Sequence, residues 1–529
     1  MVIVDFPTIP RPTVLPLNSM KILFACSEVA PFSKTGGLAD VCSSLPTALA
    51  KLGQQPIIIT PAYRCTFQCG LPMEQTDTAL SVPVGSKTVD AALWKSTLPG
   101  TNIPVWLIRQ DHYFDRDGIY TEHGEDYGDN CERFVFFCRA VMEAVKALAW
   151  KIDILHSNDW QTGLVSAYLK TLYADDKAFA KTVSLHTIHN LAYQGIFWHW
   201  DMLLTGIGWE HFTFDKMEFY GKLNLMKTGV MFADGVSTVS PQYAQEIQSQ
   251  EFGCGMEGVL RHRSPMLRGI LNGVCTKIWN PATDPHIAAP FTASDVFDKK
   301  PLCKADLQRT FGLPELPDTP LFGVVSRLDH QKGIDLVADV IPTWVERHGV
   351  QFCVLGTGNR GLEERLADLV RCFPSNIAVR AEFSDVLAHK IEAGSDMFLM
   401  PSRYEPCGLN QLYSQMYGTV PIVHKTGGLA DTVVDLSEET FENGTATGFT
   451  FRTDNVHDLN TTIWRALNVF GEKKDVWRTL IQNGMRQNWA WEKSAEQYVR
   501  FYKKLQTFVK TEKNSGDPEL DTAIMPPGV

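Results

Sequence analysis

Short apolar runs alternate with longer amphipathic stretches along most of the chain, the pattern of parallel strands joined by helices. Helical spacing predicts helices over Asp40–Leu52 and Asn130–Ala149. Apolar runs in the first half predict strands at Met20–Ser27, Pro56–Thr60, Pro104–Ile108, Ile152–His156 and Thr182–His186. The first half therefore predicts a doubly wound, Rossmann-like α/β domain over residues 20–280.

A second alternation begins after a proline-rich stretch. Seven prolines and little periodicity over 281–320 predict a hinge region. Beyond it, apolar runs predict a second Rossmann-like domain over 321–490, with strands at Leu321–Val325, Phe352–Gly356, Ile377–Arg380 and Met397–Met400.

The two ends of the chain differ in character. Glu492–Val509 predicts a long final helix rich in aromatic residues, and we expect 491–510 to pack back on the N-terminal domain. Residues 1–19 predict a flexible lead-in, without the features of a secretory signal or a transit peptide. The polar, proline-rich residues 511–529 predict a disordered tail.

Composition narrows the possible partners. A chain of 529 residues is too long for one ordinary core. Its net charge of −11 argues against nucleic acid or an anionic membrane surface as the main partner. No apolar stretch approaches the roughly 20 residues that span a bilayer. The scattered cysteines predict reduced thiols, and Cys65 and Cys69 lack a second pair for zinc, so no metal is expected.

The sequence KTGGLAD occurs twice, at Lys34–Asp40 and at Lys425–Asp431. Each copy follows an apolar run and opens a helical stretch. A glycine pair there lets the backbone approach a ligand, and a helix start favours an anion. Two tight turns without a ligand are the alternative. Neither copy has GxGxxG spacing, which argues against a dehydrogenase.

Polar groups repeatedly follow predicted strands in both halves. Arg327 and Lys332 follow one strand and could hold a diphosphate, while Glu405 follows another and could bind sugar hydroxyls. Asp159 and Trp160 pair an acid with an aromatic face suited to carbohydrate. Each residue alone is more often structural or solvated. Their accumulation favours one cleft at the strand ends of both domains.

The chain resembles the family of bacterial glycogen synthases and plant starch synthases, which elongate α-1,4-glucans from a nucleotide-glucose. The matching motifs run in family order over nearly the whole chain. They are KTGGLADV, YGDN at Tyr127–Asn130, HSNDWQTGL at His156–Leu164, HNLAYQG at His189–Gly195, GILNGV at Gly269–Val274, SRLDHQKG, PSRYEPCGL and the second KTGGLAD.

The resemblance implies a GT-B glycosyltransferase that retains anomeric configuration and needs no cofactor and no metal. It implies a catalytic set consisting of Lys34, His189, Arg327, Lys332 and Glu405. Substrate-binding positions carried over by motif are Gly36, Gly37, Asp40, Tyr127, Asp159, Trp160, Asn190, Asn272, Phe383, Cys407, Gly408, Leu409, Thr426, Gly427 and Gly428.

Specific roles follow from the same resemblance. Cations and glycine turns, including Thr426–Gly428, would hold the diphosphate. His189, Asn272 and Glu405 would surround the donor glucose, and Phe383 would face adenine. Asp40 would lie at the sugar–acceptor side, with Tyr127, Asp159 and Trp160 receiving the acceptor.

The implied reaction transfers glucose from ADP-glucose to the non-reducing end of an α-1,4-glucan, in the cytoplasm of a bacterium rather than in a plastid. Two alternatives stay open: a retaining transferase with a small acceptor, and a catalytically silent glucan-binding relative. Two positions depart from the family pattern. Cys275 stands where aspartate is usual, and Tyr413 stands where related transferases often place a second acid.

Overall fold

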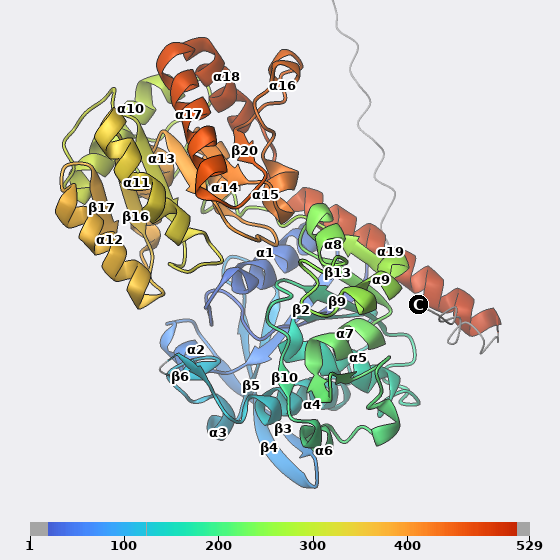
Figure 1. Cartoon of the computed structure of the whole chain (residues 1–529). Coiled ribbons are helices and arrows are strands. Elements are labelled where there is room, and N and C mark those ends of the chain that lie inside the picture. The colour runs from blue at the N-terminus through green and yellow to red at the C-terminus, as the bar shows by residue number, and fades with distance from the viewer. Residues whose placement is uncertain (1–18, 123, 516–529) are drawn as a thin grey trace, which may run out of the picture.

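The computed structural model describes residues 19–122 and 124–515, so residues 1–18 of the predicted lead-in over 1–19 and residues 516–529 of the predicted tail over 511–529 lie outside the described residues. Residues 511–515 of the predicted tail instead continue the final helix. The chain forms two α/β bodies, one above the other in Figure 1. The lower body holds a nine-stranded sheet in the order β14-β13-β9-β8-β1-β2-β5-β4-β3. The upper body holds a six-stranded sheet in the order β17-β16-β15-β18-β19-β20.

The strands of the N-terminal sheet run parallel from β14 to β5, and the hairpin β3–β4 adds an antiparallel edge. Their bounds are β1 Lys21–Ala25, β2 Gln55–Pro61, β3 Glu74–Val84, β4 Lys87–Thr97, β5 Pro104–Arg109, β8 Ile154–Asn158, β9 Val183–Ile188, β13 Gly235–Thr238 and β14 Leu267–Gly269. Small strands lie outside this sheet: β6 Thr121–Glu122, β7 Glu125–Asp126, β10 Ile196–Phe197, β11 Glu218–Phe219 and β12 Lys222–Asn224.

Helices cover both faces of this sheet. Strand β1 is apolar from Ile22 onward because its side chains point alternately into the cores on the two faces. Ile22 and Phe24 point into a core shared with α1 and α19, while Leu23 and Ala25 point into the core below α4 and α5. The helices of this body are α1 Gly37–Lys51, α2 Arg64–Gln68, α3 Asp111–Phe114, α4 Asn130–Ala147, α5 Gly163–Lys170, α6 Met202–Thr205, α7 Leu225–Phe232, α8 Pro241–Glu246 and α9 Glu257–His262.

The C-terminal sheet is parallel throughout. Its strands are β15 Leu321–Val325, β16 Gln351–Leu355, β17 Ile377–Arg380, β18 Met397–Met400, β19 Val420–His424 and β20 Phe449–Phe451. Its helices are α10 Val296–Phe311, α11 Ile334–His348, α12 Arg360–Cys372, α13 Asp385–Gly394, α14 Asn410–Met416, α15 Gly427–Thr432, α16 Glu438–Glu442, α17 Val456–Glu472 and α18 Lys474–Met485.

The structure differs from the sequence prediction in the proline-rich stretch 281–320, which contains helix α10 and belongs to the C-terminal core. Cys303 and Leu307 of α10 are buried in that body. The helical pattern is masked because Lys300 and Lys304 lie on the buried side, where their amines donate hydrogen bonds. The chain crosses between the bodies earlier, where Val274 bridges Ala490.

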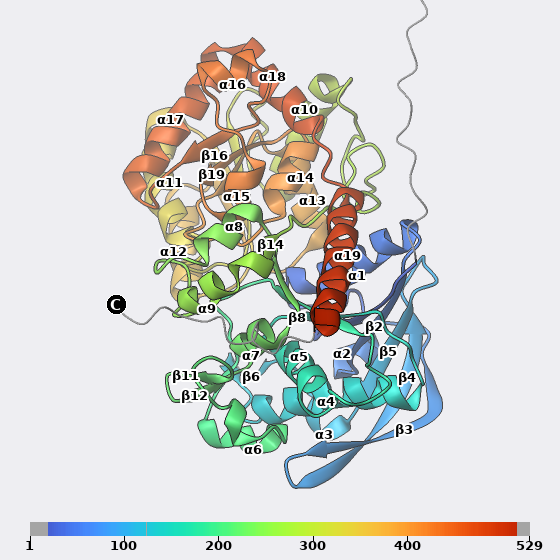
Figure 2. The ribbon, with the colours of Figure 1, turned by 90° about the vertical axis from the view of Figure 1, so that its right-hand side faces the viewer.

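The final helix α19, Trp491–Ser515, runs beside α1 along the N-terminal body (Figure 2). Trp491, Tyr498 and Tyr502 are buried in the core that α1 and β1 share. Lys51 and Glu492 form an ion pair of 2.6 Å between the two helices. Helix α19 is thus part of the N-terminal body, although its sequence follows that of the C-terminal body.

Candidate active site

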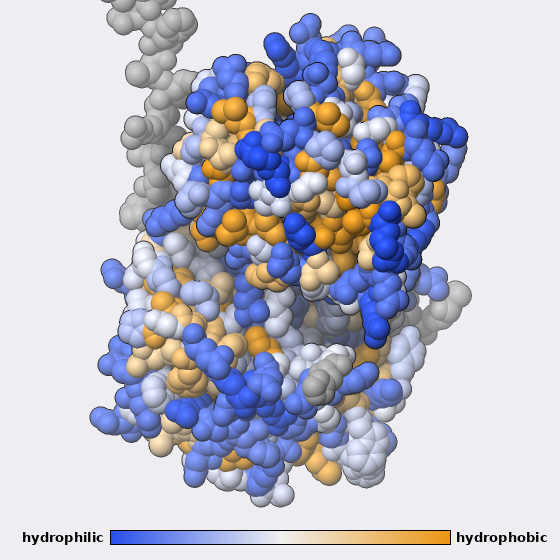
Figure 3. Space-filling model, turned by 90° about the vertical axis from the view of Figure 1, so that its left-hand side faces the viewer, coloured by the Kyte–Doolittle hydropathy of each residue, from blue (hydrophilic) through white to orange (hydrophobic). Residues whose placement is uncertain are grey.

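A cleft of about 1320 Å³ lies between the two bodies and is lined by residues from both. Figure 3 shows the hollow between the upper and lower halves. Most residues predicted for the site line this cleft: Lys34, Gly36, Gly37, Asp40, Asp159, Trp160, His189, Asn190, Asn272, Arg327, Lys332, Phe383, Glu405, Cys407, Gly408 and Leu409.

The first KTGGLAD copy forms the turn between β1 and α1 in the N-terminal wall of the cleft. The Lys34 amine and the Asp40 carboxylate are 2.9 Å apart. Behind the turn, the buried Glu28 carboxylate accepts hydrogen bonds from the backbone N–H groups of Thr35 and Gly36. A Cβ built at Gly36 or Gly37 meets nothing within 4 Å, so the turn presents open backbone to the cleft.

Asp159 and His189 are half-buried residues of the cleft, in the loops that follow β8 and β9. Asp159 adopts a φ of 55°, a conformation that costs about 1–3 kcal/mol and that clusters at functional sites. Its carboxylate accepts a hydrogen bond of 2.7 Å from the His189 backbone N–H. Burial raises the pKa of Asp159 to about 7, against the opposing hydrogen bonds from the backbone of His189 and Asn190.

The His189 imidazole is neutral at ordinary pH because burial lowers its pKa to about 3. Its Nε2 lies 3.0 Å from the Asn158 amide oxygen. Because an amide oxygen only accepts, Nε2 carries the one N–H of the neutral ring, and Nδ1 is left as an uncharged hydrogen-bond acceptor.

Trp160 lines the cleft but offers less aromatic face than its sequence position predicts. Only 9% of the residue is exposed. Its ring packs against Phe134 and Phe197, with centroids 5.0 Å and 5.6 Å away, and against Gly195.

The C-terminal wall carries two cations, of which Lys332 contacts a carboxylate of the cleft. The Lys332 amine lies 2.5 Å from the Glu405 carboxylate, which also accepts a hydrogen bond of 3.1 Å from the Ser402 hydroxyl. Arg327 is held by Asp329 at 3.0 Å, and its side chain is 52% exposed. The structure thus brings together the residues after β15 and β18 that the sequence predicts for one site.

Asn272 has an unpaired buried oxygen and Phe383 has an exposed ring, and both features favour a bound ligand. The amide oxygen of Asn272 is buried without a hydrogen-bond partner at the edge of the cleft. Such an atom is costly to leave unpaired, which favours a ligand partner. Phe383 keeps 79% of its surface exposed beside the start of α13. A large exposed ring in a cleft is suited to stacking on a flat ligand.

Tyr127 and the second KTGGLAD turn do not line the cleft. The Tyr127 ring lies against the guanidinium groups of Arg116 and Arg133, and its hydroxyl accepts from the Gly118 N–H. The Tyr127 ring is thus used in packing, and its role toward the acceptor stays a prediction.

The second turn, Thr426–Gly428, packs beneath the Glu405–Cys407 loop instead. A Cβ at Gly427 would lie 2.0 Å from the Glu405 carbonyl oxygen. The Gly427 N–H donates to the Glu246 carboxylate at 2.9 Å, and the Thr426 hydroxyl donates to it at 3.2 Å. A glutamate from the other body thus accepts from this turn, and the binding of a phosphate by Thr426–Gly428 stays a prediction.

Glu28 and Glu246 are site-forming residues that the sequence did not predict. Glu28 directly follows the first strand, so the rule that polar groups follow strand ends could have found it. Glu246 ends α8, and its contact with α15 exists only because the two bodies meet. No local signal in the sequence marks it.

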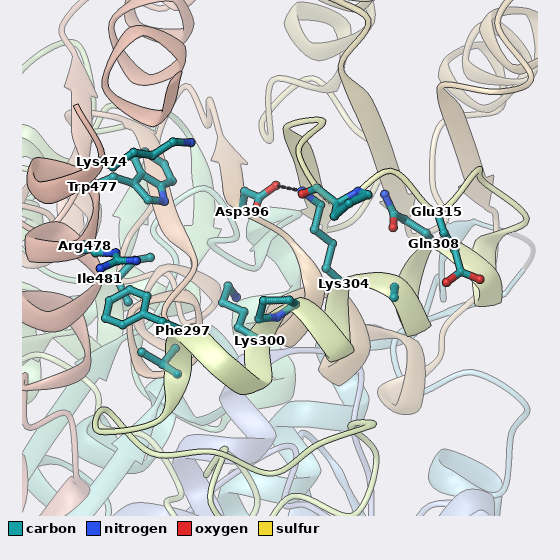
Figure 4. Close-up of a pocket in the computed structure, with 14 residues that line it drawn as sticks. Phe297, Lys300, Lys304, Gln308, Glu315, Asp396, Lys474, Trp477, Arg478 and Ile481 are labelled. Carbon is teal, nitrogen blue, oxygen red and sulfur yellow. Dashed lines mark hydrogen bonds and ion pairs between the residues drawn. The ribbon is translucent and has the colours of Figure 1, made fainter. Parts of the chain in front are cut away.

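A second pocket of about 600 Å³ lies between α10 and α18 in the C-terminal body (Figure 4). The Lys300 amine donates to the carbonyls of Ala393 and Tyr417 and to the Thr419 hydroxyl. Burial lowers its pKa to about 8. Lys304 likewise uses its donors within the protein, including a 2.7 Å ion pair with Asp396. These lysines serve packing, and we assign no ligand to this pocket.

The described residues contain neither a cluster suited to a metal ion nor a helix suited to crossing a membrane. Within 19–122 and 124–515, no group of three or more His, Cys, Asp or Glu side chains is placed to hold a metal ion. Within the same ranges, no helix combines the length and apolar character needed to cross a membrane.

The chain shares its domains with known glycosyltransferases. Residues 21–262 match the starch synthase catalytic domain, and residues 310–479 match glycosyl transferases group 1. It is 44% identical over 496 residues to a glycogen synthase of Rhodopirellula baltica, covering 91% of this chain and 97% of that relative. It is 46% identical to a glycogen synthase of Koribacter versatilis, covering 92% and 98% of the two chains.

The chain belongs to the glycogen and starch synthase family. The catalytic domain of starch synthase IV from Arabidopsis thaliana, solved with ADP and acarbose, matches with a TM-score of 0.85 and 32% identity, over 92% of this chain and 100% of that one. A sucrose-phosphate synthase from Thermosynechococcus elongatus matches at 18% identity with a TM-score of 0.54, which bears on the fold alone. The protein is a glycosyltransferase with the GT-B fold.

Proposed function

We propose that this protein transfers glucose from ADP-glucose to the non-reducing end of an α-1,4-glucan with retention of configuration, with glycogen as the product. The observation that carries the proposal is the contact between Lys332 and Glu405, which places a cation beside a carboxylate in the cleft. The starch synthase that this chain resembles was solved with ADP and acarbose, which supports a nucleotide and a glucan as the ligands here.

Each group in the cleft has a task in this reaction. Lys34, Arg327 and Lys332 stabilise the negative charge that develops on the departing diphosphate. Glu405 and Asn272 bind hydroxyls of the donor glucose, and Phe383 stacks on adenine. The bond between C1 of glucose and the phosphate oxygen breaks as the acceptor O4 approaches from the same face. The O4 proton passes to the leaving phosphate.

Closure of the two bodies on the donor excludes water, which would otherwise hydrolyse it. Neutral His189 lines the glucose site, and Asp159 holds the loop that carries it. By analogy with the bacterial relatives, we further propose a bacterial cytoplasmic location.

The test is incorporation of labelled glucose from ADP-glucose, with UDP-glucose in parallel, into glycogen and into maltose. We expect transfer to glycogen with new α-1,4 linkages. Transfer to a small acceptor alone would point to the small-acceptor transferase. If the protein binds glucan but turns over no donor, the silent relative is the correct assignment.

A further inference from the structure

Gln161 is a buried residue of the cleft whose side-chain amide has no partner among the described residues. It lines the cleft and is 6% exposed. Its Oε1 is buried and accepts no hydrogen bond from the part of the chain that the structure describes, and its Nε2 donates none to it. A buried amide without partners is costly, which favours a ligand that pairs with it.

The other buried glutamines show that this arrangement is unusual in the described part of the chain. Each of them donates a hydrogen bond through Nε2 to a protein oxygen. They are Gln54, Gln194, Gln308, Gln351, Gln411 and Gln415. The fold therefore uses the amides of these residues, whereas it leaves that of Gln161 unused.

The backbone that carries Gln161 is fixed, so the side chain has a definite place in the wall of the cleft. Gln161 belongs to the 3-10 turn Trp160–Thr162 that follows β8. Its carbonyl accepts from the Cys138 thiol at 3.2 Å, and the Thr162 hydroxyl donates to the Asn158 carbonyl at 2.8 Å. Because no hydrogen bond to a described residue holds the amide plane, rotation about its last torsion can present either oxygen or nitrogen to the cleft.

The surroundings of Gln161 suit a sugar unit of the acceptor. A hydroxyl both donates and accepts, as an amide does, whereas phosphate oxygens act as acceptors. Arg327 and Lys332, the cations proposed for the diphosphate, follow β15 in the other body. Beside Gln161, the Trp160 and Phe197 rings line the cleft with centroids 5.6 Å apart. Because the donor glucose is bonded to the diphosphate, a sugar at this wall belongs to the acceptor.

We propose that Gln161 binds a hydroxyl of the acceptor glucan inside the cleft and selects acceptors that carry this hydroxyl. This inference rests on the proposed function, because it adds a specificity-determining residue to the same site. Burial of the amide makes the selection effective, since an acceptor without the hydroxyl leaves the amide unpaired in the complex.

The first test pairs a change in the protein with a change in the acceptor. Gln161→Met removes the amide and keeps the length of the side chain. We expect kcat/KM for maltotriose to fall roughly tenfold, the usual cost of one lost hydrogen bond. The KM for ADP-glucose should stay within about twofold, because Gln161 does not contact the donor.

The acceptors are maltotriose and a set of analogues, each lacking one hydroxyl of the two glucose units at the non-reducing end. The reacting O4 of the terminal unit is kept in all of them. On the wild-type protein, one analogue should lose about tenfold in kcat/KM. On Gln161→Met, this analogue and maltotriose should react equally well, because the partner of the hydroxyl is already gone. Equal losses on both proteins for every analogue would overturn the proposal.

Thermal unfolding separates ligand binding from a structural role. Gln161→Met should not lower the melting temperature, because no hydrogen bond within the described protein is lost. Gln415→Met is the matched control, since the buried Gln415 also has an unpaired Oε1, but its Nε2 donates to the Thr432 carbonyl at 2.8 Å. The control should lower the melting temperature and keep the wild-type pattern of acceptor selection. A lower melting temperature of Gln161→Met with unchanged acceptor selection would assign the amide to the fold instead.

The two proposals fail in different ways. A wild-type protein that transfers glucose to no acceptor contradicts the proposed function. The rise in melting temperature that maltotriose causes by binding then still tests Gln161. A smaller rise for Gln161→Met than for the wild type supports the contact, and an equal rise contradicts it.

Discussion

The two copies of KTGGLAD share seven residues but differ in what surrounds them. At the first copy, Gly36 donates its N–H to Glu28, eight residues away in the same body. At the second, Gly427 donates its N–H to Glu246, which lies 181 residues away in the other body. The first turn therefore leaves its outer side open to the cleft, whereas the second is a joint between the bodies.

The same glycine pair thus serves as an open turn at the cleft in one body and as a close-packed turn in the other. Gly36 has an extended φ of −157° and open space around it, which suits the approach of a ligand. Gly427 has a φ of +43° and lies against the Glu405 carbonyl, which only glycine tolerates. The second copy thus shapes the Glu405 loop from behind.

The largest expected difference concerns the two lysines. Lys34→Ala removes a cation from the cleft and should lower kcat by about 10²–10³, the usual cost of losing one group that stabilises a leaving charge. Lys425→Ala is the matched control, because Lys425 is exposed and lies outside the cleft lining. Steady-state kinetics with ADP-glucose measure both, and equal losses would contradict the comparison.

The glycines should differ mainly in stability. Gly427→Ala places a methyl group against the Glu405 carbonyl at a positive φ, which should cost about 1–3 kcal/mol and lower kcat as the Glu405 loop shifts. Gly36→Ala should leave the free energy of unfolding unchanged. Denaturant unfolding measures the difference, and a stable Gly427→Ala protein with normal kcat would remove the loop-shaping role.

Substitution of Glu28 should lower the stability of the protein, whereas substitution of Glu246 should mainly lower kcat. Glu28→Gln loses the negative charge that its donors require and should cost about 1.5–3 kcal/mol of stability. Glu246→Gln is only half-buried and should change stability little, while kcat falls severalfold because the joint behind Glu405 loosens. Thermal unfolding and kcat, measured on both variants, test this division. A Glu246→Gln protein with wild-type kcat would show that the joint is passive.

The remaining difference arises only below neutral pH and is a pH dependence of the stability of the body that carries the first turn. Burial lowers the pKa values of His186 and His189 to about 3, and that of His156 well below its usual range. Below the unfolded value of about 6.5, the unfolded chain takes up protons that the native state does not. Stability is therefore complete above pH ~6.5 and falls as the pH drops toward 3.

His189→Gln should reduce this slope by up to about 1.4 kcal/mol per pH unit, the value for one proton. His457→Gln is the control, since His457 is exposed. Urea unfolding between pH 4 and pH 7 gives the slopes. An identical slope for wild type and His189→Gln would contradict the assignment of the proton uptake to His189.

The sequence by itself determined the strand–helix alternation and most of the cleft. Strands β15, β17 and β18 have the predicted bounds because each is a short, mostly apolar run; β18 is buried throughout, and the edge strand β17 ends at the exposed Arg380. Residues placed after such strands, including Arg327, Lys332 and Glu405, meet in one cleft because parallel strands end at the same edge. The local sequence pattern is sufficient to predict a site residue when its place at the end of a parallel strand fixes where it lies in the fold.

Tertiary structure alone decided the rest. The edge hairpin β3–β4 escaped prediction because it is half-exposed and contains Pro83. Helix α10 was hidden by two buried lysines whose partners lie far away in sequence. The contact of the second KTGGLAD turn with Glu246 joins residues that are 181 positions apart. For helix α10 and for this turn, the deciding partner is distant along the chain, and only packing of the folded protein brings it into contact.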